Sequence, residues 1–471
     1  MKLVVVMLLI SAALPLAAQA PSAAAQREAR DILAEMVSLN TSLARGDVTP
    51  LAEKLAARFR AAGVPAADVT VIGPEQKNEN LVVRIRGKGA SKPVLFLAHL
   101  DVVDALRSDW SLDPFALTEK DGWLYGRGTI DDKGPAATLV AGVLALVRSK
   151  VTPDRDIILA LTSGEESAGD PGAAWLVRTR RSLVDAEWVF NFDAGGPVID
   201  RGKMAWMEMQ SAEKVYWTVT LTARNAGGHS SLPRADNAIY ELMNGVRGIE
   251  ALAFPIDLTE IARAELEART QFVDAEQARL IHAALRQPLD SAAAFRLARF
   301  SPSYNAILRT TCVPTMLSGG HAENALPETA TATVNCRIIP GEKSSDVLVA
   351  LRRAVNDTGV AIAEVAAAKP SPPSPLLPER IALVKAALRS AWGHDVPIVP
   401  VQENGATDGL YFRNAGIPVY GVLGIPMPVG EERLHGKDER IPVKSFRDGV
   451  AFATALIRET AGGKKGKPTR P

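Results

Sequence analysis

Five short segments of the sequence end in side chains that commonly bind metal ions. We interpret each of these side chains as following directly after a buried strand. The ligands are His99, Asp131, the Glu165-Glu166 pair, Asp193 and His435. Imidazole nitrogens and carboxylate oxygens are the usual protein ligands of divalent ions such as zinc. Ligands in this number indicate a centre that holds two metal ions and activates water for hydrolysis.

The first segment, residues 94–98, is a continuous apolar run of strand length that ends at His99. Because side chains alternate along a strand, we expect His99 and Asp101 to point the same way. The Asp101 carboxylate would then hold one nitrogen of the imidazole while the other nitrogen binds a cation. We therefore assign Asp101 to the catalytic centre.

A glycine-rich segment, residues 126–134, surrounds the carboxylates Asp131 and Asp132 at the start of a predicted helix. Glycine lets the backbone approach closely, and a helix N-terminus favours negative charge. The segment does not match a dinucleotide-binding fingerprint, because Asp131 stands where the third glycine is required. Since a carboxylate has two oxygens that can each bind a cation, we assign Asp131 to bridge the two metal ions.

The adjacent glutamates Glu165 and Glu166 follow an apolar run at residues 159–161. Two like charges side by side cost free energy unless a cation or a proton separates them. One carboxylate can therefore bind metal while the other accepts a proton from the attacking water. Taken alone, such a pair is more often part of a solvated loop, and the matching position of Asp193 after residues 189–192 favours the metal site.

The elements that must position these residues alternate between strands and helices. Apolar spacing predicts two helices between Gln26 and Ala62 and a long helix at 135–150. Alternation of strands with helices predicts an α/β domain with a mainly parallel central sheet. The predicted strands are 69–72, 81–85, 94–98, 157–161 and 189–192.

A second domain interrupts the first. Residues 214–368 have the order of an α+β lid with a split βαβ, ferredoxin-like plan, and a charged helical insertion at 258–299 is placed on its outside. The predicted order is strand 215–222, helix 235–248, strands 305–317 and 329–338, helix 344–357 and strand 360–366. The proline-rich residues 369–378 act as a linker. The catalytic domain is therefore discontinuous, with parts at 26–213 and 379–460.

The composition narrows the function further. With 471 residues, 47% of them hydrophobic, the chain can form at least two packed domains. A net charge of +1 gives no indication of a nucleic acid partner. Residues 1–20 are typical of a secretory signal peptide rather than a membrane span, so we expect an exported protein, periplasmic or secreted. The basic residues 461–471 are expected to form a disordered tail.

The two cysteines, Cys312 and Cys336, lie on two predicted strands that form a hairpin about a turn near Asn324. This hairpin places the two sulfurs face to face. In an oxidising compartment they would form a disulfide. Two small apolar side chains buried in a sheet are an equally good interpretation.

Together, these motifs resemble those of the co-catalytic zinc hydrolases, a family that includes glutamate carboxypeptidase, carboxypeptidase S, aminoacylase and succinyl-diaminopimelate desuccinylase. The resemblance runs from about Asn80 to Gly449 and is strongest to the carboxypeptidase S and N-acyl-amino-acid hydrolase branch. The segments that carry it are His99-Leu100-Asp101, residues 126–134, Glu165-Glu166, Asp193, residues 227–233, Arg309-Thr310-Thr311, residues 324–327, residues 334–341 and His435.

The resemblance implies two zinc ions, with cobalt or manganese as alternative metals. It implies that one ion is held by His99, Asp131 and Asp193. The other ion would be held by Asp131, Glu166 and His435.

Further roles are implied by the same resemblance. Glu165 would be the general base, and the peptide bond between Asp131 and Asp132 would be cis. His229 would reach the cleft from its own or a partner subunit to stabilise an oxyanion. The alternative role for His229 is that of a capping residue in a turn. The residues implied to hold the substrate carboxylate are Arg337, Asn324, Thr407 and Asp408. For Arg337 the alternative is a surface salt bridge.

These observations predict an exported two-zinc hydrolase that cleaves the amide bond before a C-terminal amino acid in dipeptides, small peptides or N-acyl amino acids. Its partner is that substrate, with no nucleic acid and no stable membrane span, and the protein is a monomer or a homodimer through the lid. One alternative is a narrow deacylase of a single metabolic intermediate. Another is a non-catalytic binding module on the same fold.

Overall fold

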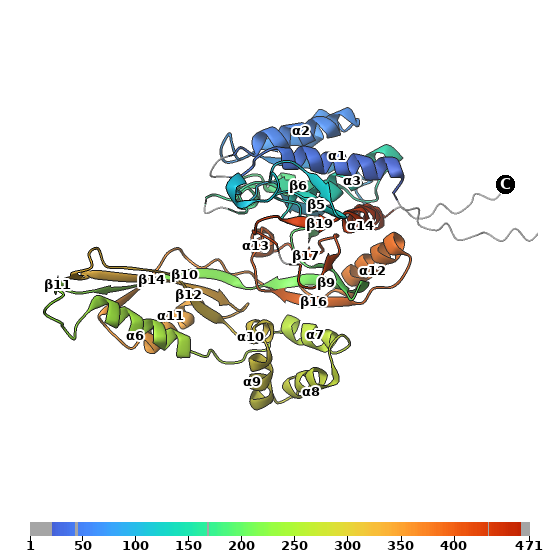
Figure 1. Cartoon of the computed structure of the whole chain (residues 1–471). Helices are drawn as coiled ribbons and strands as arrows, with labels where there is room; N and C mark the ends of the chain where they lie inside the picture. The colour runs from blue at the N-terminus through green and yellow to red at the C-terminus, as the bar shows by residue number, and fades with distance from the viewer. Residues whose placement is uncertain (1–20, 43–45, 167–168, 432, 463–471) are drawn as a thin grey trace, which may run out of the picture.

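The computed structural model describes residues 21–42, 46–166, 169–431 and 433–462. The expected signal peptide at 1–20 and residues 463–471 of the expected tail lie outside this range. Figure 1 shows an upper body, formed by the two ends of the described chain, and a lower, elongated part formed by its middle. None of the described helices is long and apolar enough to cross a membrane.

The upper body is built on a ten-stranded sheet. In its centre β6, β3, β7 and β17 pair in parallel, as the alternation of strands and helices predicts. Strands β3 and β6 are buried along their whole length, which explains why they read as unbroken apolar runs. The order is β1 (Val69–Ile72), β2 (Asn80–Ile85), β6 (Ile157–Thr162), β3 (Val94–His99), β7 (Trp188–Asn191), β17 (Val419–Gly421), β9 (Lys203–Glu213), β8 (Gly196–Asp200) and β18 (Met427–Pro428), with β16 (Ile398–Glu403) paired to β9.

Helices cover both faces of this sheet and bury a separate apolar core against each face. One face carries α1 (Ala23–Ser38), α2 (Thr49–Ala61), α3 (Lys133–Ser149), α12 (Pro378–Trp392) and α14 (Val443–Ala461). The opposite face carries α4 (Gly172–Thr179), α5 (Arg181–Val184) and α13 (Gly409–Asn414). A small three-stranded sheet joins the N-terminal and C-terminal parts of the upper body. It consists of β4 (Thr118–Lys120), β5 (Trp123–Tyr125) and β19 (Arg440–Pro442).

The lid has the predicted split βαβ order. Its sheet is antiparallel, and alternate residues of β14 are buried against α6 and α11. The strands run in the order β12 (Thr311–Gly319), β14 (Thr329–Ile338), β10 (Val215–Arg224) and β15 (Val360–Glu364). The helices are α6 (Ala238–Ala251) and α11 (Ser344–Val355), and a two-stranded ribbon of β11 (Gly228–His229) and β13 (Ala325–Leu326) projects from the sheet.

One prediction about this region is wrong. The predicted strand at 305–317 is split, because Pro302 starts the helix α10 (Pro302–Leu308) and Ser301 caps it. The insertion therefore has four helices, α7 (Glu260–Arg269), α8 (Ala275–Ala284), α9 (Ser291–Phe300) and α10. Its helices form an apolar cluster of their own outside the lid core, and α7 packs against β16 of the upper body (Figure 1).

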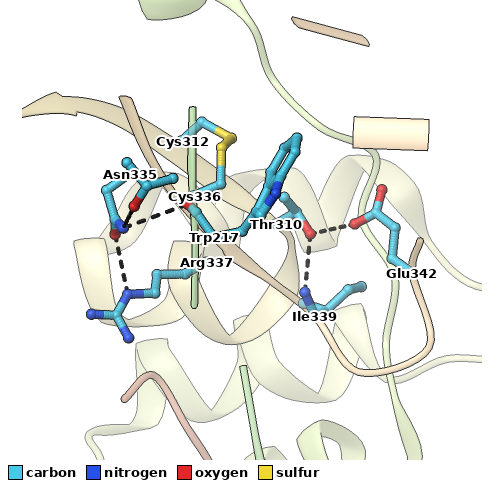
Figure 2. The surroundings of a disulfide bond; sticks show 9 residues. Trp217, Thr310, Cys312, Asn335, Cys336, Arg337, Ile339 and Glu342 are labelled. Carbon is cyan, nitrogen blue, oxygen red and sulfur yellow. Dashed lines mark hydrogen bonds between the residues drawn. A yellow bond between two sulfur atoms is a disulfide. The ribbon is translucent and has the colours of Figure 1, made fainter. Parts of the chain in front are cut away.

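Cys312 and Cys336 are directly opposite each other in the pairing of β12 with β14 and form a disulfide. The hairpin register therefore agrees with the prediction at this point, and the question that the sequence left open is answered in favour of the bridge. A bulge between Pro314 and Met316 shifts the register by one residue further along. Figure 2 shows the disulfide on the opposite side of β14 from Asn335 and Arg337.

Candidate metal centre

Three of the predicted ligands follow adjacent parallel strands. His99 ends β3, Glu165 follows β6 by three residues, and Asp193 follows β7 by two. Because parallel strands end at the same edge of a sheet, these side chains are brought together there. The interpretation that every ligand follows a strand is wrong for two of them, since Asp131 lies in the loop before α3 and His435 in the loop before β19.

Asp131 lies between the two histidines, with one carboxylate oxygen facing each. Its Oδ1 is 2.8 Å from His99 Nε2, and its Oδ2 is 2.9 Å from His435 Nε2. Glu166 Oε1 is also 2.9 Å from His435 Nε2, and Asp193 Oδ1 is 3.6 Å from His99 Nε2. This arrangement is the one expected of a carboxylate that bridges two neighbouring cations.

Within the part of the chain that the structure describes, three groups of side chains have ligand atoms close enough to share an ion. One is the predicted set Asp131, Glu166 and His435. The others are His99 with Asp132 and Asp193, and His99 with Glu165 and Glu166. The peptide bond between Asp131 and Asp132 is cis, as the resemblance implies.

The residues present fit divalent cations. Asp132 Oδ1 is buried and has no hydrogen-bond partner among the described residues, while Asp132 Oδ2 accepts from the backbone N–H of His99. Five carboxylates and two imidazoles form a donor set suited to zinc, cobalt or manganese. These side chains would hold two such ions.

The electrostatics of the cluster point the same way. Burial raises the pKa of Asp193 to about 7 and raises the pKa of Glu166. Burial also raises the pKa of Glu165 well above its usual value, and Asp193 adds to the effect. Hydrogen bonds to Asp131 and Glu166 raise the pKa of His435 to about 10. The cluster thus carries more negative charge than the protein alone compensates.

Asp101 acts differently from the prediction. Its backbone oxygen, 3.0 Å from His99 Nδ1, holds the imidazole, while its carboxylate oxygen is 3.7 Å from that nitrogen. The carboxylate instead accepts from the backbone N–H groups of Glu165 and Glu166, at 3.2 and 3.0 Å. The reason is that β3 ends at His99, so the alternation of side chains does not extend to Asp101.

One buried residue near the cluster, Glu439, was not predicted from the sequence. Its carboxylate accepts from the backbone N–H groups of Gly128, Ile130 and Asp131 and pairs with Arg127 at 2.8 Å. It therefore fixes the loop that carries the bridging aspartate. In the sequence it lies in a charged stretch, residues 437–440, that is typical of a solvated loop, so no local signal could have found it.

The carboxylate cluster opens into a cavity of about 870 Å³. Arg337 of β14 reaches this cavity, where its Nη1 donates to the backbone oxygen of Asn404 at 3.3 Å and its guanidinium lies 4.7 Å from the ring centre of Tyr216. Burial lowers the pKa of Arg337. None of the described carboxylates forms an ion pair with it, so the alternative of a surface salt bridge is not what the structure shows.

Of the remaining predicted residues, Thr407 and Asp408 lie at or near the cavity, whereas Asn324 and the predicted catalytic residue His229 lie away from it. Thr407 borders the cavity, and its hydroxyl donates to Glu213 at 3.0 Å. Asp408 lies behind it and accepts from Thr162 at 2.7 Å. His229 and Asn324 are exposed on the β11–β13 ribbon, which Figure 1 shows at the tip of the lid. Neither of them borders the cavity of its own chain.

The chain matches the model of a known family, "Peptidase family M20/M25/M40", over residues 95–459. It is 30% identical over 384 residues to the human protein named N-fatty-acyl-amino acid synthase/hydrolase PM20D1, covering 79% of this chain and 75% of that one. It is 28% identical to probable carboxypeptidase S-like 2 of Dictyostelium discoideum, covering 81% and 75%.

Among solved structures, the fold is similar to that of an M20 family metallo-carboxypeptidase from Sulfolobus solfataricus. The TM-score is 0.72 at 16% identity, and the match covers 92% of this chain and 99% of that one. At this identity the comparison bears on the fold alone, and it supports the discontinuous α/β body with an inserted lid.

Proposed function

Since the chain belongs to the peptidase family M20/M25/M40, we propose that it is a two-metal hydrolase that cleaves the amide bond before a C-terminal amino acid in N-acyl amino acids or small peptides. The family is a dinuclear metal-binding peptidase family, and zinc is the expected metal. One observation carries the proposal: the two carboxylate oxygens of Asp131 face two different histidines, each with a further carboxylate within reach.

Bound divalent ions would polarise the scissile carbonyl and make a water molecule more acidic. Glu165 borders the cavity and is the general base. It accepts the proton of the attacking water and passes it to the leaving amine. Burial raises its pKa well above its usual value, and a raised pKa makes the carboxylate a stronger proton acceptor.

Arg337 binds the C-terminal carboxylate of the substrate. Its guanidinium borders the cavity without a carboxylate partner among the described residues, and a planar guanidinium can donate two parallel hydrogen bonds to a carboxylate. The positive charge of Arg337 is therefore available to pair with the substrate carboxylate. This gives a physical reason for an enzyme that acts next to a free C-terminus.

The acyl side of the substrate meets an apolar wall. The cavity is lined there by aliphatic side chains of β8, β18 and the loops beside them, and this wall favours an apolar acyl group, consistent with the name of the human relative. Each buried methylene stabilises binding by about 0.8 kcal/mol. The aliphatic residues are Ile130, Val198, Leu423, Ile425, Met427 and Leu434.

A second copy of the chain completes the site. His229 does not border the cavity of its own chain. The outer strand β12 exposes Val313, Met316 and Leu317, and α6, which contacts β12, exposes Tyr240 and Met243. An exposed apolar edge strand is a surface for pairing with another chain. Docking there would bring the partner's ribbon over the cavity, where its imidazole would stabilise the oxyanion.

Export is part of the same proposal. It is supported by the composition of residues 1–20 and by the disulfide between Cys312 and Cys336, because such bonds persist in oxidising compartments. Detection of the protein in the periplasmic or secreted fraction, with its N-terminus shortened, is the expected result. A full-length protein in the cytosolic fraction would contradict export.

The decisive experiment couples metal analysis to hydrolysis. We expect about two metal ions per chain, turnover of N-acyl amino acids of increasing chain length and of dipeptides, loss of activity with a chelator and recovery with zinc, cobalt or manganese. A narrow deacylase would act on one acyl group only. A metal-free protein that hydrolyses none of the panel would be the non-catalytic binding module.

A further inference from the structure

The guanidinium of Arg337 is held on several sides by groups that carry no charge. Its Nε donates to Asn335 Oδ1 at 3.3 Å, and its Nη1 donates to the backbone oxygen of Asn404 at 3.3 Å. The ring of Tyr216 lies 4.7 Å from it. These contacts orient the side chain and leave its positive charge uncompensated.

Asn335 is itself fixed in one orientation. Its Nδ2 donates to Thr218 Oγ1 at 3.1 Å and to the backbone oxygen of Trp217 at 3.5 Å. With both donations made toward β10, the amide oxygen faces Arg337 along the same face of β14 (Figure 2). Cys336, the residue between them, faces the other way and is tied to Cys312 on the neighbouring strand.

Arg337 borders the cavity and Asn335 does not, so we expect Asn335 to affect the substrate through Arg337. We propose that Asn335 is a positioning residue that aims the guanidinium of Arg337 at the substrate carboxylate. This inference rests on the proposed function, in which Arg337 binds that carboxylate. A charge-assisted hydrogen bond depends strongly on geometry, and a side chain as long as arginine gains affinity when its rotamers are fixed in advance.

The neutrality of Asn335 is part of its role. A carboxylate at the same position would accept from the guanidinium equally well but would also compensate its charge. The substrate carboxylate would then compete with a permanent internal partner and meet a like charge beside it. An amide oxygen supplies the acceptor without the charge.

The test compares two substrates that differ only at the C-terminus, an N-acyl amino acid and its carboxamide. The measured quantity is the ratio of their kcat/KM values. Wild-type protein is expected to favour the carboxylate, and Arg337→Met to abolish that preference. Asn335→Leu is expected to reduce the preference about tenfold through KM, with hydrolysis of the carboxamide unchanged.

Two more variants separate orientation from charge. Thr218→Val removes one anchor of the Asn335 amide and should reduce the preference less than Asn335→Leu. Asn335→Asp keeps the acceptor and adds a charge, so it should reduce the preference at least as much as Asn335→Leu. The matched control is Thr333→Val, two positions earlier on the same face of β14, which should retain the wild-type ratio.

The outcomes distinguish this inference from the proposed function. If Arg337→Met leaves the ratio unchanged, the carboxylate site itself is wrong. If Arg337→Met abolishes the preference while Asn335→Leu stays within about twofold of wild type, Asn335 does not position Arg337. Equal losses on both substrates would show a purely structural role, and a wild-type ratio in Asn335→Asp would overturn the argument from neutrality.

Discussion

At the scale of single residues, the centre is a set of buried negative charges that the protein alone does not balance. Five carboxylates approach two imidazoles at one edge of the sheet. Bringing like charges together in a buried site costs free energy that bound cations recover. In the mechanism proposed above, the side chains that would hold the cations lie beside Glu165, so one arrangement would serve both metal binding and the base.

The base is tested by replacing Glu165 with glutamine. The variant keeps the size of the side chain and is expected to bind two metal ions as wild type does, because all the ligands that the family resemblance implies are untouched. These are His99, Asp131, Glu166, Asp193 and His435. Turnover should fall to less than about a hundredth of the wild-type rate, since the amide cannot accept the proton. Metal content and kcat are measured on the same preparation, and a variant that retains more activity would show that another group is the base.

Glu439 is tested by Glu439→Gln. The amide oxygen can accept from only part of the backbone N–H groups that the carboxylate now holds, and Arg127 loses its oppositely charged partner. We expect metal affinity to fall by about 10- to 100-fold, as for other residues that orient metal ligands. Competition with a chromophoric chelator measures this affinity, with the surface change Glu459→Gln as control. Unchanged affinity would limit Glu439 to a role in folding.

At the scale of elements, the helical insertion belongs by sequence to the lid but packs on the catalytic body. Glu265 of α7 accepts from the backbone N–H of Gln402 at 2.9 Å on the otherwise open side of β16. Arg269 bridges Glu265 and Glu208 at 2.9 and 3.0 Å, and Glu208 borders the cavity. The insertion therefore supports one wall of the active site.

Glu265→Ala tests this support. The change leaves Arg269 without one of its two partners and the N–H of Gln402 unsatisfied, and removing one member of a buried pair destabilises strongly. We expect unfolding free energy in urea to fall by about 3 kcal/mol. Glu267→Ala, on the exposed side of the same helix, should change it little. Equal effects of the two variants would mean that α7 does not stabilise β16.

At the scale of the whole molecule, the cavity and His229 lie in different parts of one chain, so we expect activity to require two copies. This is tested by mixing two inactive variants, His229→Ala and Glu165→Gln. Random dimers would regain about a quarter of the wild-type rate, because half of them carry one intact site of two. Sedimentation shows whether dimers form. A monomer, or a mixture that stays inactive, would contradict the proposed dimer.

Several features of this protein could be predicted from its sequence alone. Apolar runs and alternating patterns predict the strands β3, β6 and β7, the four-stranded lid sheet and the ligands at the strand ends. These patterns depend only on neighbours in the chain. The motif around Asp131 carried its own signal through its glycines. The register that joins Cys312 to Cys336 followed from the hairpin, because two consecutive strands pair by their shared turn.

Only the tertiary structure decided which distant side chains meet. Glu439 under the Asp131 loop, Asn335 behind Arg337 and Glu265 against β16 are pairings between separate elements, and each residue looks ordinary in its own segment. The same is true of His229, whose distance from the cavity depends on how the lid projects from the body. Contacts of this kind depend on the packing of whole elements, which nearest-neighbour patterns in a sequence do not contain.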